Sequence, residues 1–192
     1  MGRLSGKVVY ITGGSSGIGE AIAHAFAKEG ASLVIVARRI QLLEHVRQDI
    51  ERNYPNVKVL TAQVDVTKRE QVKQSVQQAE RTIGPIDILI NNAGVFPLNL
   101  MKNLKEDEWD MTIDINCKGV LNGIAAVLPN MMARKTGIIV NISSDAGKKV
   151  FPGLTVYSGT KHFVEAVTIG LRQEMVPYNI KVVFFFFFVI LI

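Results

Sequence analysis

Residues 12–19 read Thr12-Gly13-Gly14-Ser15-Ser16-Gly17-Ile18-Gly19, and this stretch decides the fold that we expect for the chain. It follows the β-rich run 7–12 (KVVYIT) and precedes a stretch of helical period over 18–29. Glycines let backbone amides approach a pyrophosphate, whose charge faces the positive N-terminus of the next helix. The alternative is a tight connection between strand and helix. We predict a dinucleotide site whose contacts from this loop are Gly13, Ser15, Ser16, Gly17, Ile18 and Gly19.

Apolar runs of strand length alternate with stretches of helical period along the chain. We expect further strands at 32–37, 57–62, 86–91 and 137–142, and further helices at 40–52, 68–82 and 155–176. Residues 105–134 have helical period and are expected to form two helices that break near Asn116. This alternation with apolar strands is typical of an α/β protein with a mostly parallel sheet and helices on both faces. We expect a single domain over residues 1–181.

Residues 182–192 (VVFFFFFVILI) form an anomalous apolar tail. Its first residues suit a sixth buried strand. A membrane span needs about 20 apolar residues, so this shorter run does not qualify. The tail carries no turn, cap or charge, and we interpret it as a truncated or mis-specified terminus rather than a designed feature.

Composition excludes several classes of protein. Of the 192 residues 48% are hydrophobic and 20% are charged, and the net charge is +5, which is ordinary for a globular domain. The basic pairs Arg38-Arg39 and Lys148-Lys149 are too short for a nucleic-acid interface. The single cysteine, Cys117, favours a reducing compartment. We therefore expect a soluble cytoplasmic protein with a small-molecule substrate, no nucleic-acid or membrane partner and, from the histidine spacing, no metal.

The end of the second expected strand distinguishes NADP from NAD. An NAD site has a carboxylate about 20 residues beyond the glycines to accept the ribose 2′-hydroxyl. Here Ala37 is followed by Arg38 and Arg39, with no acid until Glu44. Because Arg38 can form a charge-assisted bond to a 2′-phosphate, we favour NADP(H) over NAD(H). The alternative is that both arginines only solvate the loop.

Tyr157 and Lys161 are four residues apart in the expected helix, so they share one face. An ammonium stabilises a phenolate, and we expect it to lower the pKa of Tyr157 toward the working pH. Tyr157 is then a candidate general acid for a carbonyl oxygen. Such a pair is also common on solvated helix faces, but Ser143-Ser144 end a strand ahead of it and can converge with it beside the cofactor.

Over residues 4–181 the chain closely resembles the short-chain dehydrogenase/reductases. The resemblance rests on five motifs in order: the glycine loop, Asn91-Asn92-Ala93-Gly94, Asn116, Ser144, and Tyr157-Ser158-Gly159-Thr160-Lys161. It implies a Rossmann-like doubly wound fold and reversible hydride transfer between NADP(H) and a carbonyl compound or an alcohol.

By position, the resemblance implies that Ser144 polarises the substrate oxygen, Tyr157 is the acid/base, and Lys161 holds the nicotinamide ribose. It further implies that Asn116 anchors a proton-relay water, and it gives as further cofactor contacts Asp65, Val66, Asn91 and Ala93. Simpler interpretations exist: Asn91 as a turn former, Asn116 as a bond to the backbone at a helix break, and Asp65 as a helix-start residue.

The resemblance also marks a departure. Family members run to about 250 residues and continue past the sixth strand with a nicotinamide contact, a substrate loop and further elements. We expect incomplete C-terminal strands and doubtful oligomer contacts here, although a full-length form is expected to be a homo-oligomer. The rival functions are a catalytically impaired dinucleotide-binding protein and an epimerase or dehydratase of the extended branch. Residues expected to border the pocket, and to suit a partly apolar substrate with a polar end, are Asp145, Lys148, Val150 and Phe151.

Overall fold

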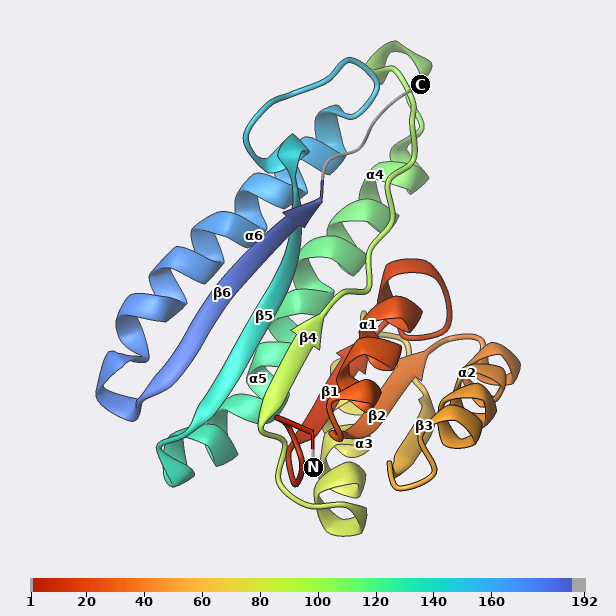
Figure 1. Cartoon of the computed structure of the whole chain (residues 1–192). Coiled ribbons are helices and arrows are strands. Elements are labelled where there is room, and N and C mark those ends of the chain that lie inside the picture. Colours follow the sequence, from red (N-terminus) through yellow and green to blue (C-terminus); the bar gives the residue numbers. More distant parts are fainter. Residues whose placement is uncertain (1, 188–192) are drawn as a thin grey trace.

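The computed structural model describes residues 2–187. Its centre is a six-stranded sheet in the order β3-β2-β1-β4-β5-β6, with every pairing parallel (Figure 1). The strands are β1 (Val8–Thr12), β2 (Ser32–Ala37), β3 (Val59–Gln63), β4 (Ile88–Asn91), β5 (Gly137–Ser144) and β6 (Ile180–Phe187). The strand order reverses between β1 and β4, which confirms the doubly wound, Rossmann-like fold.

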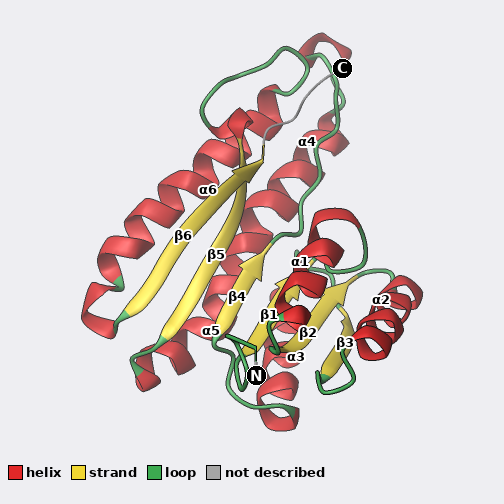
Figure 2. Cartoon of the chain, in the orientation of Figure 1, coloured by secondary structure: helices red, strands yellow, loops and turns green. Residues whose placement is uncertain are grey.

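Helices cover both faces of this sheet (Figure 2). On one face α1 (Gly17–Lys28) and α2 (Ile40–Asn53) pack against the strands, and on the other lie α3 (Arg69–Thr82), α5 (Gly119–Arg134) and α6 (Thr155–Glu174). Successive residues of a strand point to opposite faces, so each strand contributes to two cores. Tyr10 of β1 belongs to the core under α3 and α5, whereas its neighbour Ile11 belongs to the core under α1 and α2.

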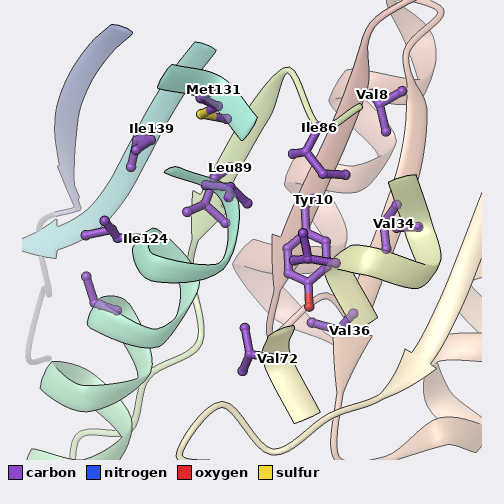
Figure 3. Close-up of a cluster of buried hydrophobic side chains, with 14 of the residues drawn as sticks. Val8, Tyr10, Val34, Val36, Val72, Ile86, Leu89, Ile124, Met131 and Ile139 are labelled. Carbon is purple, nitrogen blue, oxygen red and sulfur yellow. The ribbon is translucent and has the colours of Figure 1, made fainter. Parts of the chain in front are cut away.

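The larger core shows how the helices are held on the sheet (Figure 3). Tyr10 is fully buried at its centre, and its hydroxyl forms a 2.6 Å hydrogen bond with the Ser75 hydroxyl of α3. Leu89 of β4 and Met131 of α5 are also fully buried in this core. The two buried hydroxyl groups are thus hydrogen-bonded to each other inside the core. This packing fixes the carboxyl ends of the strands, where loops are long enough to form a site.

Three expectations about elements need correction. The helical stretch 105–134 does not break at Asn116, because α4 (Glu106–Ile113) continues through the π-helical turn Asp114–Lys118 into α5. Strand β5 extends to Ser144, past the expected end at residue 142. Strand β6 begins at Ile180 and runs to Phe187, so the expected tail boundary at residue 182 falls inside a strand. Residues 188–192 of that tail lie outside the described residues.

The continuous helix Glu106–Arg134 is long and apolar enough, by length and composition, to cross a membrane. However, 56% of its apolar window is buried inside the protein, where α5 packs against the sheet and α3. Buried core helices can have the same length and apolar composition, so the packing of this helix accounts for its apolar character.

Candidate active site

A cavity of about 470 Å³ opens at the carboxyl ends of the strands. It is lined by the glycine loop, the ends of β2 and β5, the residues after β3 and β4, and the start of α6. The cavity spans the point between β1 and β4 where the strand order reverses, which is where open α/β sheets bind their ligands. The expected site residues found in its lining are Gly13, Ser15, Ser16, Gly17, Ile18, Gly19, Arg38, Asp65, Val66, Ala93, Ser144, Tyr157 and Lys161.

The glycine loop is shaped so that side chains are excluded from it. Gly13 has φ +68°, and a Cβ at Gly19 would lie 2.2 Å from the carbonyl oxygen of Gly13. Gly17 has φ +58° and faces open space. Ser16, the residue that precedes α1, caps no backbone amide with its side chain. The first amides of α1 are therefore left to bind an anion from the cavity.

Asn92 holds the glycine loop against the end of β4. Its Nδ2 donates to the carbonyl oxygens of Thr12 at 3.0 Å and Gly13 at 3.2 Å. The Thr12 hydroxyl in turn accepts from the backbone amides of Asn92 and Ala93, each at 3.0 Å. Asn92 was absent from the expected site residues, although it stands in the quoted motif 91–94. The loop is thus positioned by bonds from another strand rather than by its own sequence.

Both arginines after β2 line the cavity, and both are exposed. Arg39 is held across the loop, because its Nη2 donates to the Ser16 hydroxyl at 3.1 Å. We expected only Arg38 to contact the cofactor. The sequence pairs the two residues but cannot show which guanidinium turns to the loop.

The other expected cofactor contacts differ in position. Asp65 lines the cavity, and its Oδ1 also accepts bonds from the Thr67 amide at 3.0 Å and hydroxyl at 2.8 Å. Asn91 is buried and does not line the cavity. Its Nδ2 donates to Asn141 Oδ1 at 2.9 Å, so its side chain links β4 to β5.

Ser144 lies at the end of β5, while Tyr157 and Lys161 lie one turn apart in α6, and all three line the same part of the cavity. Each is buried, with relative exposures of 2%, 9% and 6%. Lys161 Nζ donates to the Ile142 carbonyl oxygen at 2.8 Å and lies 5.6 Å from the centroid of the Tyr157 ring. The arrangement can bring a hydroxyl donor, a phenol and an ammonium to one substrate oxygen.

The expected lowering of the Tyr157 pKa is not observed. Burial raises this pKa above its ordinary value, hydrogen bonding with Ser144 lowers it, and the Asp145 carboxylate raises it further. Burial also lowers the pKa of Lys161 to about 8. Desolvation outweighs the attraction that we expected, because both groups sit deep in the protein with few compensating charges.

The Asn116 side chain bonds to segments outside its own helix. Its Nδ2 donates to the Val95 carbonyl oxygen at 2.8 Å and to the Thr160 hydroxyl at 3.1 Å, while its Oδ1 accepts from the Val95 amide at 2.9 Å. The side chain therefore joins the loop after β4 to α6. The π-helical turn presents this residue inward, and π-helical turns are common at functional sites.

None of the four residues after Ser144 that we expected to border the pocket lines the cavity. Asp145 Oδ1 accepts a 3.0 Å bond from the Ser144 hydroxyl, and Lys148 forms an ion pair with the buried Glu165. Val150 is 63% exposed, and Phe151 packs against the small cluster that contains Tyr157. A residue that the sequence did not indicate, Phe96, lines the cavity beside Tyr157, with ring centroids 5.9 Å apart.

These residues fit a dinucleotide. The cradle excludes side chains at Gly13 and Gly19, an uncapped helix N-terminus faces the cavity, and Asp65 is the one acidic residue among the described lining residues. Residues 7–186 match the sequence profile of the family described as short chain dehydrogenase. The chain belongs to the short-chain dehydrogenase/reductase family.

Similar proteins agree with this assignment. The chain is 49% identical over 181 residues to the glycine betaine reductase ATRR of Emericella nidulans, covering 94% of this chain and 14% of that protein. A metagenomic short-chain oxidoreductase solved with NADP has a TM-score of 0.90 and 30% identity, covering 95% of this chain and 82% of that one. An NAD+-bound xylitol dehydrogenase has a TM-score of 0.91 and 30% identity, covering 95% and 70%. The chain is an oxidoreductase of this family, whose members bind NADP or NAD.

Proposed function

We propose that the protein is an NADP(H)-dependent oxidoreductase that interconverts a carbonyl compound and an alcohol, with Tyr157 as general acid/base. One observation carries the proposal: Ser144, Tyr157 and Lys161 line the same cavity as the glycine loop. When bound, the cofactor supplies or accepts the hydride. The loop amides and Arg38 with Arg39 would hold its phosphates, and Lys161 would bind a ribose hydroxyl.

The chemistry assigned to the chain concerns the substrate oxygen. In reduction, the Ser144 hydroxyl donates to the carbonyl oxygen and orients it, while Tyr157 delivers a proton to the oxygen as its charge develops. The raised pKa of Tyr157 keeps the phenol protonated at neutral pH, which suits a proton donor. Asn116, through Val95 and Thr160, keeps the wall of the cavity in place. The intact triad gives no support to the catalytically impaired alternative.

Support for NADP over NAD comes from the end of β2. Ala37 stands where an NAD site places a carboxylate, and two exposed arginines follow it. A guanidinium pairs well with a phosphate, so a 2′-phosphate gains an interaction that a hydroxyl lacks.

For the substrate, the name of the Emericella protein supports including quaternary ammonium compounds among those tested. A cytoplasmic location is part of the proposal, as is a homo-oligomeric full-length form. The buried free thiol of Cys117 fits a reducing compartment.

Replacement of the proton donor tests the assigned role of Tyr157. We expect Tyr157→Phe to lower kcat by about a hundredfold to ten-thousandfold, the usual contribution of a general acid. The Kd for NADPH should change by less than about twofold, because the ring is retained. NADPH consumption with a panel of aldehydes and ketones and fluorescence titration of NADPH give both values. Retained turnover, or lost cofactor affinity, contradicts the assignment.

Charge removal at the end of β2 tests the cofactor preference. Arg38→Ser and Arg39→Ser should each raise the Kd for NADPH about tenfold and leave that for NADH within about twofold. Arg52→Ser is the matched control, since its side chain is 75% exposed on the distant end of α2. Equal losses for both nucleotides would argue against contact with a 2′-phosphate.

A further inference from the structure

The carboxylate of Glu165 contacts both ends of the turn that carries Ser144. Glu165 stands on α6 and is buried. Its Oε1 accepts a 3.1 Å hydrogen bond from the Ser143 hydroxyl, and its Oε2 forms an ion pair with the Lys148 ammonium. Ser143 precedes Ser144 in the chain and Lys148 follows it by four residues, so one buried group holds the turn on both sides.

The turn closes tightly over this carboxylate. A Cβ at Gly147 would lie 2.6 Å from Glu165 Oε1 and 3.0 Å from the Ser143 hydroxyl oxygen, so the close approach depends on the absence of a side chain there. Within the turn, the Ser144 hydroxyl accepts a 3.2 Å bond from the Ala146 amide. Breaking a buried ion pair leaves an uncompensated charge, so this arrangement resists displacement.

One face of α6 contacts the end of β5 at successive helical turns. Tyr157, Lys161 and Glu165 are spaced four residues apart and share this face. The Lys161 ammonium donates to the Ile142 carbonyl oxygen at 2.8 Å, whereas Glu165 accepts from Ser143, the next residue of β5. Among the described residues Lys161 forms no ion pair with Glu165. The two charged groups therefore have separate partners, and Glu165 acts on the strand end and the turn.

We propose that Glu165 is a positioning residue that holds the Ser144 hydroxyl beside the Tyr157 phenol. This inference rests on the proposed function and adds a residue that does not line the cavity. Glu165 acts through Ser143 and Lys148. Because the peptide bond between Ser143 and Ser144 is rigid, holding the first residue restricts the second. A group displaced by about 1 Å from its working position can lose about a hundredfold in rate.

The anchor at Lys148 can be removed from the protein surface. Its side chain is 53% exposed, so Lys148→Met opens no core. With the carbonyl compound that the wild type reduces fastest, we expect kcat to fall about tenfold, since a small displacement is enough. The Kd for NADPH should stay unchanged, and Lys148→Arg should restore kcat because a guanidinium also pairs with a carboxylate. Lys149→Met is the matched control, because Lys149 is exposed and has no ion pair within the described part of the chain.

A double-mutant cycle shows whether Glu165 acts through Ser144. Glu165→Gln keeps the shape of the side chain and loses its charge, and should lower kcat by up to about a hundredfold. In the Ser144→Ala background, where the hydroxyl is absent, the same change should have no further effect on kcat. A general loss of structure would lower kcat in both backgrounds. Equal losses in both overturn the inference and leave the proposed function standing.

A measurement without turnover separates this inference from the proposed function. In protein labelled with 3-fluorotyrosine, the fluorine resonance of Tyr157 is the one missing from Tyr157→Phe, and it responds to hydrogen bonding of the phenol with Ser144. Ser144→Ala, Lys148→Met and Glu165→Gln should all move it in the same direction. Such shifts support the positioning role even if no carbonyl compound is reduced, in which case only the proposed function fails. A resonance that either Lys148→Met or Glu165→Gln leaves unmoved overturns the inference.

Discussion

Lys161 is a residue whose burial lowers the stability of the folded protein while it serves the chemistry of the site. Its ammonium is buried, its one recorded hydrogen bond goes to the Ile142 carbonyl oxygen, and burial lowers its pKa to about 8. At pH 7 the folded protein therefore holds a charge that the unfolded chain would keep in water at no cost. Functional residues often carry such a penalty, because the site needs the charge where packing opposes it.

The pH dependence of stability tests this penalty. Between pH 8 and 10.5 the unfolded chain binds the Lys161 proton and the folded protein does not, so stability rises with pH in this interval. The contribution is at most about 1.4 kcal/mol per pH unit. Urea unfolding of wild type and Lys161→Met at pH 7 and pH 9.5 should show this rise only in the wild type.

The matched control is Lys118→Met, whose ammonium is 63% exposed beside Asp114. Its unfolding free energy should retain the rise seen in the wild type. A Lys161→Met variant that retained the rise would show that another group is responsible for it.

At the scale of elements, the site depends on how strands and helices are joined to each other. Glu165 lies two turns after Tyr157 in α6, is buried, and accepts a 3.1 Å bond from the Ser143 hydroxyl of β5. It also pairs with Lys148, so α6 holds both sides of the turn that contains Ser144. Asn92 does the same for the glycine loop and β4. These cross-connections keep the catalytic and cofactor-binding residues in register.

Two glycines in helices give opposite predictions. Gly19→Ala places a methyl group against the Gly13 carbonyl oxygen and should lower the free energy of unfolding by about 1–3 kcal/mol and abolish NADPH binding. A Cβ at Gly170 in α6 meets no atom within 4 Å, so Gly170→Ala should raise the free energy of unfolding by about 0.5–1 kcal/mol. Chemical unfolding and fluorescence titration measure both, and a tolerant Gly19→Ala would refute the close approach.

At the scale of the whole molecule, the cavity is built from both halves of the sheet. The glycine loop and the arginines come from the β1–β3 side, whereas Ser144 and Tyr157 come from the β5–α6 side. A ligand that spans the cavity therefore contacts both halves of the sheet. A ligand that binds only the native state stabilises that state by mass action.

We accordingly expect NADPH to raise the Tm of the 192-residue chain in one cooperative transition. At 100 times its Kd the nucleotide contributes about 2.7 kcal/mol, several degrees for a domain of this size. NADH at the same concentration should raise the Tm less. The Gly19→Ala variant is the control that should not respond. A transition unaffected by either nucleotide would contradict the dinucleotide site.

Much of the fold could be predicted from local pattern. The expected strand 32–37 coincides with β2, and the expected helices 40–52 and 68–82 differ from α2 and α3 by one residue. The misplaced boundaries have one cause in common. Ser143 and Ser144 extend β5, and Ile180 begins β6, because pairing with a neighbouring strand continues past the apolar run. The periodicity of apolar residues indicates which positions are buried. It does not indicate where hydrogen bonding between strands begins or ends.

The sequence predicted which residues form the site, but it did not predict the contacts and burial of those residues. Motif order indicated the glycine loop, Ser144, Tyr157 and Lys161, and the structure brings these together in one cavity. Phe96 gave no signal, because it stands in a loop without periodicity. The expected direction of the shift in the Tyr157 pKa was wrong. Spacing along a helix indicates which groups are near each other but not how deeply they are buried.

The sequence by itself therefore determined the family, the alternation of strands and helices, and the residue types that meet at the strand ends, because these depend on order along the chain. Only the tertiary structure decided which arginine turns to the loop, that Asn91 faces a strand rather than the cavity, and that the Asp145 carboxylate accepts a hydrogen bond from the Ser144 hydroxyl. The physical reason is that charge, desolvation and hydrogen bonding depend on distances between segments far apart in sequence, which only packing establishes.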